Sequence, residues 1–289
     1  MATFLDKITK VRGEMGDRPR RTIETFDGDG TKTVFETSER PIRANSFTVK
    51  VGSTTQTEGS SNDFTIDLDL GLITFTAGSI PTTGTDNVEV QYQYVKRTEA
   101  EYLELYNDAL MYFKDRFWLE EYDETSLSTV KDQFQYDVGT IDADVFWVVG
   151  LQLESAAGKA DWAAATNWKY LPQLNKIEVN PTFSVGSLAL RFHVLKRYAL
   201  GTGTGNTYPV QDRYSLPFEY YVKHRLYERM IAEKIDQVGA ITTNATFVPG
   251  PAVVNVAQYY LDLANDTAKK IAPKMPPQAI RQVTGGKII

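Results

Sequence analysis

The stretch Val88-Glu-Val-Gln-Tyr-Gln-Tyr-Val-Lys-Arg97 decides the fold of this chain, because it recurs in a related form further along. Its counterpart is Leu188-Ala-Leu-Arg-Phe-His-Val-Leu-Lys-Arg197, which begins 100 positions later. Both stretches alternate apolar and polar residues, a pattern typical of a β-strand with one buried face and one wet face. We therefore expect two antiparallel β regions that are built alike.

Two further pairs of segments support a duplication. Phe47-Thr-Val-Lys-Val is matched by Phe146-Trp-Val-Val-Gly, 99 positions later, and Leu72-Ile-Thr-Phe is matched by Lys176-Ile-Glu-Val, 104 positions later. Three collinear matches at nearly constant spacing predict a repeated unit. Chance convergence of two similar β regions stays open, since alternating strands resemble one another.

Helical patterns flank the two β regions. Residues 2–16 carry apolar residues at helical spacing, and Thr3 is placed to cap the start of a helix. Thr98 and Glu101 fit a capping box, and the apolar stripe after them predicts a helix of about 20 residues that ends near the acidic stretch 120–124.

Two more helices are expected in the C-terminal part of the chain. One has Pro217 in its first turn, and the other begins after Pro249-Gly-Pro251 and stops at Pro273. Residues 273–289 then form a tail that ends in Lys-Ile-Ile. Apolar residues are costly to leave in water, so the tail either frays or adds to another protein as an extended strand.

These patterns predict an α+β fold, with a helical bundle core and two duplicated antiparallel β modules inserted between the helices. The expected division of the chain is an N-terminal core helix (1–21), β module 1 (22–97), a core helix (98–124), β module 2 (125–200), a linker with two core helices (201–272) and an extended C-terminal tail (273–289).

Composition excludes several classes of protein. The chain has 31 Lys and Arg against 37 Asp and Glu, a net charge of −6, no Cys and two His, which excludes disulfides, thiolate metal sites and a three-His zinc site. The longest apolar run, residues 145–149, is far shorter than the roughly 20 residues of a membrane span, and residues 1–10 lack a signal-peptide core. We expect a soluble protein made in the cytosol. The acidic balance also favours a linker over a nucleic-acid patch for Arg18-Pro-Arg-Arg21.

Two loops resemble ligand-binding motifs without meeting their requirements. Residues 201–205 are rich in glycine, but no Lys-Ser or Lys-Thr follows, so a flexible linker is favoured over a phosphate loop. Residues 27–32 begin like a calcium loop, but Lys32 and Ser38 stand where that loop needs Gly and Glu. A tight turn is the simpler interpretation.

Candidate catalytic residues are few. Asp67 and Asp69 share one face of a strand and could in principle work as paired carboxylates, but a solvated hairpin face is favoured because no third polar group is identifiable nearby. His193 and His224 have no Ser or Cys in a recognisable nucleophile elbow. We therefore expect no catalytic, cofactor-binding or metal-binding residues, and no enzyme.

Three segments carry a resemblance to a known family. Phe4-Leu-Asp-Lys-Ile-Thr-Lys-Val-Arg-Gly-Glu-Met-Gly-Asp17 resembles the first helix of tailed-bacteriophage head-to-tail connector (adaptor) proteins, and Glu101-Tyr-Leu-Glu-Leu-Tyr-Asn-Asp-Ala-Leu-Met-Tyr-Phe113 resembles their main helix. Asp63-Phe-Thr-Ile-Asp-Leu-Asp-Leu-Gly-Leu-Ile-Thr-Phe75 is similar to strand-turn-strand segments of phage virion proteins. The chain departs from the compact, mainly helical adaptor by carrying two β modules.

The resemblance implies a structural role in the virion neck. Adaptors of this kind form a ring of twelve copies under the portal protein and offer a platform to tail or neck proteins. The resemblance thus implies a homo-oligomer made in the host bacterial cytoplasm, with no cofactor and no membrane contact. Double-stranded DNA would cross the lumen without sequence-specific binding, and an acidic lumen suits that because it repels phosphate.

The same resemblance assigns two sets of residues. Contacts between subunits would be made by the helical stripe Leu103, Tyr106, Leu110, Phe113, Tyr220, Tyr227 and Ile231. Docking on the portal would be made by the tail residues Ile280, Arg281, Val283, Ile288 and Ile289, through main-chain hydrogen bonds to a strand edge and burial of the isoleucines.

Two alternatives belong to other classes of protein. A carbohydrate- or receptor-binding virion module would use exposed aromatic side chains, and Trp147, Trp162 and Trp168 are the candidates for a sugar platform. A hydrolase built on Asp67 and Asp69 is the weaker alternative.

Overall fold

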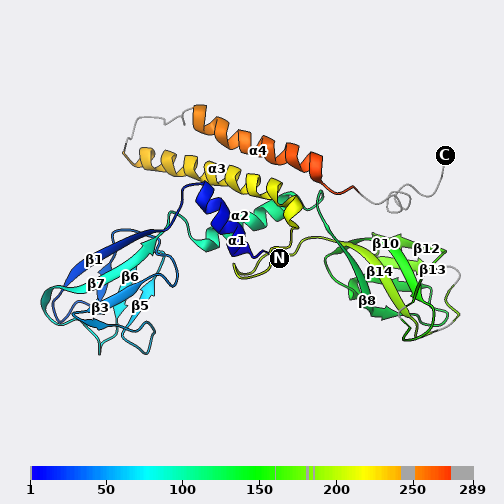
Figure 1. The fold of residues 1–289 in the computed structure, drawn as a ribbon, viewed down its shortest axis with the longest axis horizontal. Helices are drawn as coiled ribbons and strands as arrows, with labels where there is room; N and C mark the ends of the chain where they lie inside the picture. The colour runs from blue at the N-terminus through cyan, green and yellow to red at the C-terminus, as the bar shows by residue number, and fades with distance from the viewer. Residues whose placement is uncertain (1, 160, 180–181, 185, 242–250, 275–289) are drawn as a thin grey trace. The chain divides into compact units, whose positions relative to one another are not determined.

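The computed structural model describes residues 2–159, 161–179, 182–184, 186–241 and 251–274 (Figure 1). It contains helices and antiparallel sheets, so the chain has an α+β fold.

The chain divides into two compact units. Residues 2–105 and 202–207 form the first unit, and the described residues of 106–201 and of the chain after 207 form the second. Each unit contains one β module, which we call module 1 and module 2.

Module 1 consists of seven antiparallel strands in two sheets. The four-stranded sheet has the order β1-β7-β3-β4, and the three-stranded sheet has the order β2-β6-β5. The strands are β1 (Arg20–Gly28), β2 (Val34–Glu36), β3 (Thr48–Val51), β4 (Thr54–Thr55), β5 (Phe64–Asp67), β6 (Leu72–Phe75) and β7 (Gly84–Tyr94).

Module 2 repeats this plan. Its sheets have the orders β8-β14-β10-β11 and β9-β13-β12. The strands are β8 (Leu119–Ser128), β9 (Gln135–Asp137), β10 (Val145–Glu154), β11 (Trp162–Ala164), β12 (Trp168–Leu171), β13 (Lys176–Val179) and β14 (Ala189–Lys196), with a short 3-10 helix η1 (Val138–Thr140) between β9 and β10. Each strand of module 2 occupies the place held in module 1 by the strand seven numbers earlier. The segments that matched in sequence, β3 with β10, β6 with β13 and β7 with β14, therefore hold equivalent places.

Each module buries its own apolar core between its two sheets. In module 1 the core includes Phe35, Val90 and Tyr92, and in module 2 it includes Val148, Ile177 and Phe192. Val90, Tyr92, Ile177 and Phe192 alternate along their strands with polar residues, because successive side chains of a strand point to opposite faces. Trp147 lies in the second of these cores with only 7% of its surface exposed. It is therefore not a residue of an exposed sugar platform.

Four α-helices complete the described chain: α1 (Phe4–Glu14), α2 (Glu99–Tyr112), α3 (Ser215–Ile241), preceded by the 3-10 helix η2 (Asp212–Tyr214), and α4 (Pro251–Ile271). The capping boxes predicted for Thr3 and for Thr98 with Glu101 are both present. The last helix begins at the predicted proline and ends before Pro273.

The helix predicted over residues 98–124 is wrong in its length. α2 ends at Tyr112, and the acidic residues 120–124 belong to strand β8, so module 2 begins at Leu119 rather than at residue 125. The apolar spacing continued past the helix because the turn after α2 places Phe113 and Phe117 in one core. The ring centroid of Phe218 lies 5.1 Å from that of Phe113 and 5.2 Å from that of Phe117.

Two predicted linkers are also corrected. The segment 18–21 is not a loose connection, because β1 begins at Arg20 and pairs with β7 from its first residue. The glycine-rich segment 201–206 makes hydrogen bonds at several of its residues. In the second unit Gly201 exchanges two hydrogen bonds with the side chain of Asn107, and in the first unit Thr204 and Asn206 accept hydrogen bonds from the first two backbone N–H groups of α1. Those groups would otherwise lack partners at a helix start.

Candidate functional site

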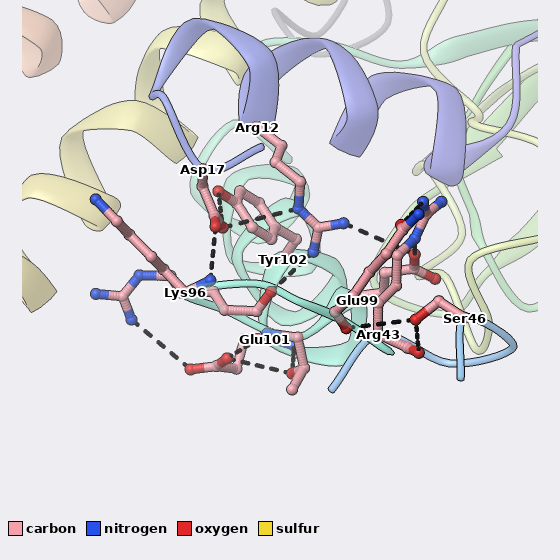
Figure 2. A network of polar contacts seen from close by, with 11 residues as sticks. Arg12, Asp17, Arg43, Ser46, Lys96, Glu99, Glu101 and Tyr102 are labelled. Atoms are coloured by element: carbon pink, nitrogen blue, oxygen red, sulfur yellow. Dashed lines mark hydrogen bonds and ion pairs between the residues drawn. The ribbon is translucent and has the colours of Figure 1, made fainter. Parts of the chain in front are cut away.

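Arg12 is the centre of a buried polar network in the first unit (Figure 2). It continues the spacing of Phe4 and Ile8 along α1, so its side chain enters the interior on the apolar face of the helix. Only 4% of Arg12 and 5% of Asp17 is exposed. A charge placed in an apolar stripe is the one sequence signal that could have located this network, and the sequence reasoning did not use it.

The partners of Arg12 come from three places in the chain. Its Nη2 donates a hydrogen bond of 2.8 Å to the carbonyl oxygen of Arg97, its Nε lies 3.7 Å from Oδ2 of Asp17, and its Nη1 lies 3.7 Å from Oε1 of Glu99. The guanidinium also lies over the ring of Tyr102, at 5.0 Å from the centroid. Arg12 therefore joins α1 to the last residues before α2 and to the first turn of α2.

Asp17 binds the two ends of module 1 together. It follows Gly16, whose φ of +70° suits glycine where the chain leaves α1. Its Oδ1 accepts a hydrogen bond of 2.7 Å from the backbone N–H of Lys96, and its Oδ2 accepts one of 3.1 Å from the hydroxyl of Tyr102. The chain enters module 1 just after Asp17 and leaves it at Lys96. One carboxylate therefore holds together the two points where the chain enters and leaves the module. We call the set Arg12, Asp17, Glu99 and Tyr102 the polar joint.

The surroundings of Tyr102 keep its hydroxyl protonated. Burial raises the pKa of Tyr102 well above its ordinary value, and the negative charge of Asp17 raises it further. Beside the joint lies a largely apolar cavity of about 170 Å³, lined by Ile42, Leu68 and Val95 together with Arg12, Arg43 and Glu99. Glu99 bridges the two arginines, since its Oε1 lies 3.7 Å from Nε of Arg43 as well.

The predicted catalytic candidates have structural partners. Oδ1 of Asp67 accepts hydrogen bonds from the backbone N–H groups of Asp69 and Leu70, which forms the hairpin turn. His193 stacks on Tyr122 at 4.4 Å and lies 2.5 Å from Glu120, while His224 contacts the carbonyl oxygen of Ala257. Among the described residues no group of three or more His, Asp or Glu could hold a metal ion. In the same part of the chain no helix is long and apolar enough to cross a membrane.

Three of the predicted subunit-contact residues lie inside the chain. Tyr106, Leu110 and Phe113 are buried in the second unit, Tyr106 against Tyr208 and Phe113 against Phe218. In the single chain these side chains contact other parts of the same chain, and their assignment to subunit contacts stays a prediction. Leu103 and Ile231 are half-buried.

Tyr220 and Tyr227, two further predicted contact residues, belong to a group of rings on α3 and α4 that we call the tyrosine cluster. Tyr260 of α4 stacks on Tyr227 at 5.6 Å and lies 6.2 Å from Tyr220. Tyr259 extends the cluster outward, 5.5 Å from Tyr260 and 59% exposed. The sequence reasoning found the α3 half of this cluster and missed the α4 half. The tail residues Ile280, Arg281, Val283, Ile288 and Ile289 lie outside the described residues.

Comparison with known proteins finds likenesses among solved structures but no match in sequence. No family model matches the chain, and no curated protein matches it. A chain in a solved structure titled "Neck of empty GTA particle computed with C6 symmetry" is 15% identical over 56% of this chain and 78% of that one, with a TM-score of 0.22.

We predict that Arg12→Met destabilises the protein by about 3–5 kcal/mol, because the carboxylate of Asp17 then stays buried without its cation. Chemical denaturation measures the free energy of unfolding. The matched control is Arg40→Met, whose ion pair with Glu36 is half exposed and should contribute about 1 kcal/mol or less. Equal losses for the two variants would contradict a structural role of the joint.

Tyr102 gives the joint a pH dependence at the alkaline end. Because the folded protein holds the phenol proton more tightly than the unfolded chain, this stabilisation is complete below about pH 10 and declines as the pH rises above it. Unfolding free energies measured at about pH 9 and about pH 11 should fall more steeply for the wild type than for Tyr102→Phe. Equal slopes would contradict the raised pKa.

Proposed function

We propose that this protein is a non-catalytic structural protein of the virion neck, a head-to-tail adaptor. Copies of the chain form a ring under the portal protein, connect the capsid to tail or neck proteins, and let the DNA pass. The proposal starts from the sequence resemblance of α1, α2 and the β5–β6 hairpin to phage proteins. As a phage protein, the chain would be made in the cytoplasm of the bacterial host.

The observation that carries the proposal is the tyrosine cluster. Interfaces between proteins are enriched in tyrosine, and a packed group of rings loses little side-chain freedom when a partner covers it. In the cluster Tyr227 and Tyr260 hold each other by stacking, while Tyr259 presents its ring to solvent. Tyr259 is thus placed to act as an anchor side chain in an interface, and the stacked rings behind it support it. The cluster lies on α3 and α4, the two helices that would form the helical core of a ring.

The chain's charge supports passage of DNA without capture. With a net charge of −6 the chain does not attract phosphate as a whole, and weak binding lets DNA move through a channel. The C-terminal tail is the proposed contact with the portal, through Ile280, Arg281, Val283, Ile288 and Ile289. A ring multiplies such contacts, because each docked tail raises the local concentration of the next.

We predict that Tyr259→Ser weakens ring formation more than tenfold, since truncating an anchor side chain costs about 2 kcal/mol or more. Native mass spectrometry over a concentration series, with negative-stain images of the assembled fraction, measures the effect. Leu174→Ser is the matched control, because Leu174 is 58% exposed and lies in module 2. A ring that forms equally well with Tyr259→Ser would remove the tyrosine cluster from the interface. A wild-type chain that is monomeric even with portal present would overturn the adaptor proposal.

A variant truncated after Pro273 tests the role of the tail. It should fold with the thermal midpoint of the full chain, because the described helix α4 ends at Ile271. It should fail to be retained by portal rings in a pull-down in which the full chain is retained. Retention of both proteins would refute docking through the tail.

A further inference from the structure

The two modules expose equivalent edge strands. Among the described residues, β1 pairs only with β7 in the four-stranded sheet of module 1, and β8 pairs only with β14 in that of module 2. These are the first strands of the two modules and hold the same place in the repeated plan. An edge strand carries unpaired backbone groups on its outer side, so it can lie against a strand of another chain.

The β1 edge is basic at its start, and its acidic residues Glu24 and Asp27 come later in the strand and accept hydrogen bonds from Ser38 and Asp86. Arg20 and Arg21 are exposed at the start of the strand, and Arg18 is exposed two residues before it. Within the part of the chain that the structure describes, no ion pair forms to any of these three side chains. Ile23, the next outward residue of β1, is 55% exposed. The edge therefore presents a large apolar side chain beside unpaired positive charge, in a chain whose net charge is negative.

The β8 edge is acidic. Glu120, Glu121 and Glu124 are exposed and contact residues of β14: Glu120 contacts His193, Glu121 contacts Lys196 and Glu124 contacts Arg191. Lys196 is also bound by Asp142, and Asp123 lies between the glutamates. The acidic residues thus outnumber the two permanent cations beside them.

An apolar group is also exposed on this edge. Tyr122 is 49% exposed, and its ring is fixed between the ring of His193 and the guanidinium of Arg191, each 4.4 Å away. Each edge therefore has an exposed apolar side chain close to charges, and the first residues of the two strands carry opposite charges.

Opposite charges select one way of pairing. Two β1 edges repel each other and so do two β8 edges, which disfavours a symmetric dimer built on either. A β1 edge attracts a β8 edge, and a contact between two different patches repeats from copy to copy until the ring closes.

We propose that the β1 edge of one copy lies against the β8 edge of the next copy. Arg18, Arg20 and Arg21 of one copy face Glu120, Glu121 and Glu124 of its neighbour, and Ile23 is buried near Tyr122. The inference rests on the proposed ring and names the surface that joins its subunits through the β modules. It adds a second contact to that of the tyrosine cluster.

Charge reversal on the full chain tests this contact. One variant is Arg20→Glu with Arg21→Glu, and the other is Glu120→Lys with Glu121→Lys. In the second variant Lys196 keeps its contact with Asp142. Sedimentation velocity measures the assembled fraction. Each variant alone should assemble more than tenfold more weakly than the wild type, because the reversed residues then face residues of their own sign on the neighbouring copy.

An equimolar mixture of the two variants should recover assembly. In the mixture the reversed β1 edge meets the reversed β8 edge, and the two unchanged edges meet each other. Such recovery between two chains cannot come from a contact within one chain, and it requires that both variants are folded. The control is Lys131→Glu with Lys159→Glu, two exposed lysines of module 2 whose reversal changes the net charge as much as that of Arg20 and Arg21. It should assemble like the wild type.

Three results would overturn the contact: unchanged assembly of both reversed variants, a mixture that stays dissociated, or a wild type that is monomeric at every concentration. Loss of double-stranded DNA binding by Arg20→Glu with Arg21→Glu, with assembly intact, would instead make the β1 edge a phosphate-binding surface. The portal pull-down tests the adaptor proposal separately. Reversed variants that assemble normally and bind portal would refute the edge contact and leave the adaptor standing.

Discussion

The antiparallel pairing of the first and last strand of each module is the constraint on which the rest of the structure depends. β1 pairs with β7 from Arg20 opposite Tyr94, and β8 pairs with β14 from Leu119 opposite Lys196. Because the last strand runs back along the first, the chain leaves each module beside the point where it entered. A whole module can therefore be inserted at one place, with a small joint to hold its two ends.

The entry and exit points of the two modules are held together by different interactions. In the first unit the crossings are held by the polar joint, whose buried charges add little net stability but fix the positions of the groups that pair. In the second unit the corresponding crossings are held by aromatic rings, with Phe117 and Tyr198 packed around Phe218, and here burial of apolar surface is the stabilising term. Repeats with one strand order thus differ at their joints as well as in the charges of their edges.

Predictions from the sequence were wrong where the same local pattern of residues fits two different local structures. Phe113 and Phe117 keep helical spacing past the end of α2 because a turn can bring both rings to the same core. Residues 120–124 are nearly all acidic and lack the apolar–polar alternation that indicates a strand, so their place in β8 depends on pairing with β14. The glycine-rich segment 201–206 was read as a linker, since its hydrogen bonds to α1 and Asn107 come from residues about a hundred or more positions away, which local patterns do not indicate.

The sequence by itself determined the α+β class, the repetition of the β module and the starts of the helices, because periodicity and capping act over a few residues. It also located half of the tyrosine cluster, through the stripe on α3. Only the tertiary structure decided which side chains of a stripe are buried, as with Tyr106 and Phe113, and which charges meet, as with Arg12 and Asp17. It also decided that β1 and β8 are edge strands. A strand is at an edge when no other strand pairs with its outer side, and that depends on how distant segments pair.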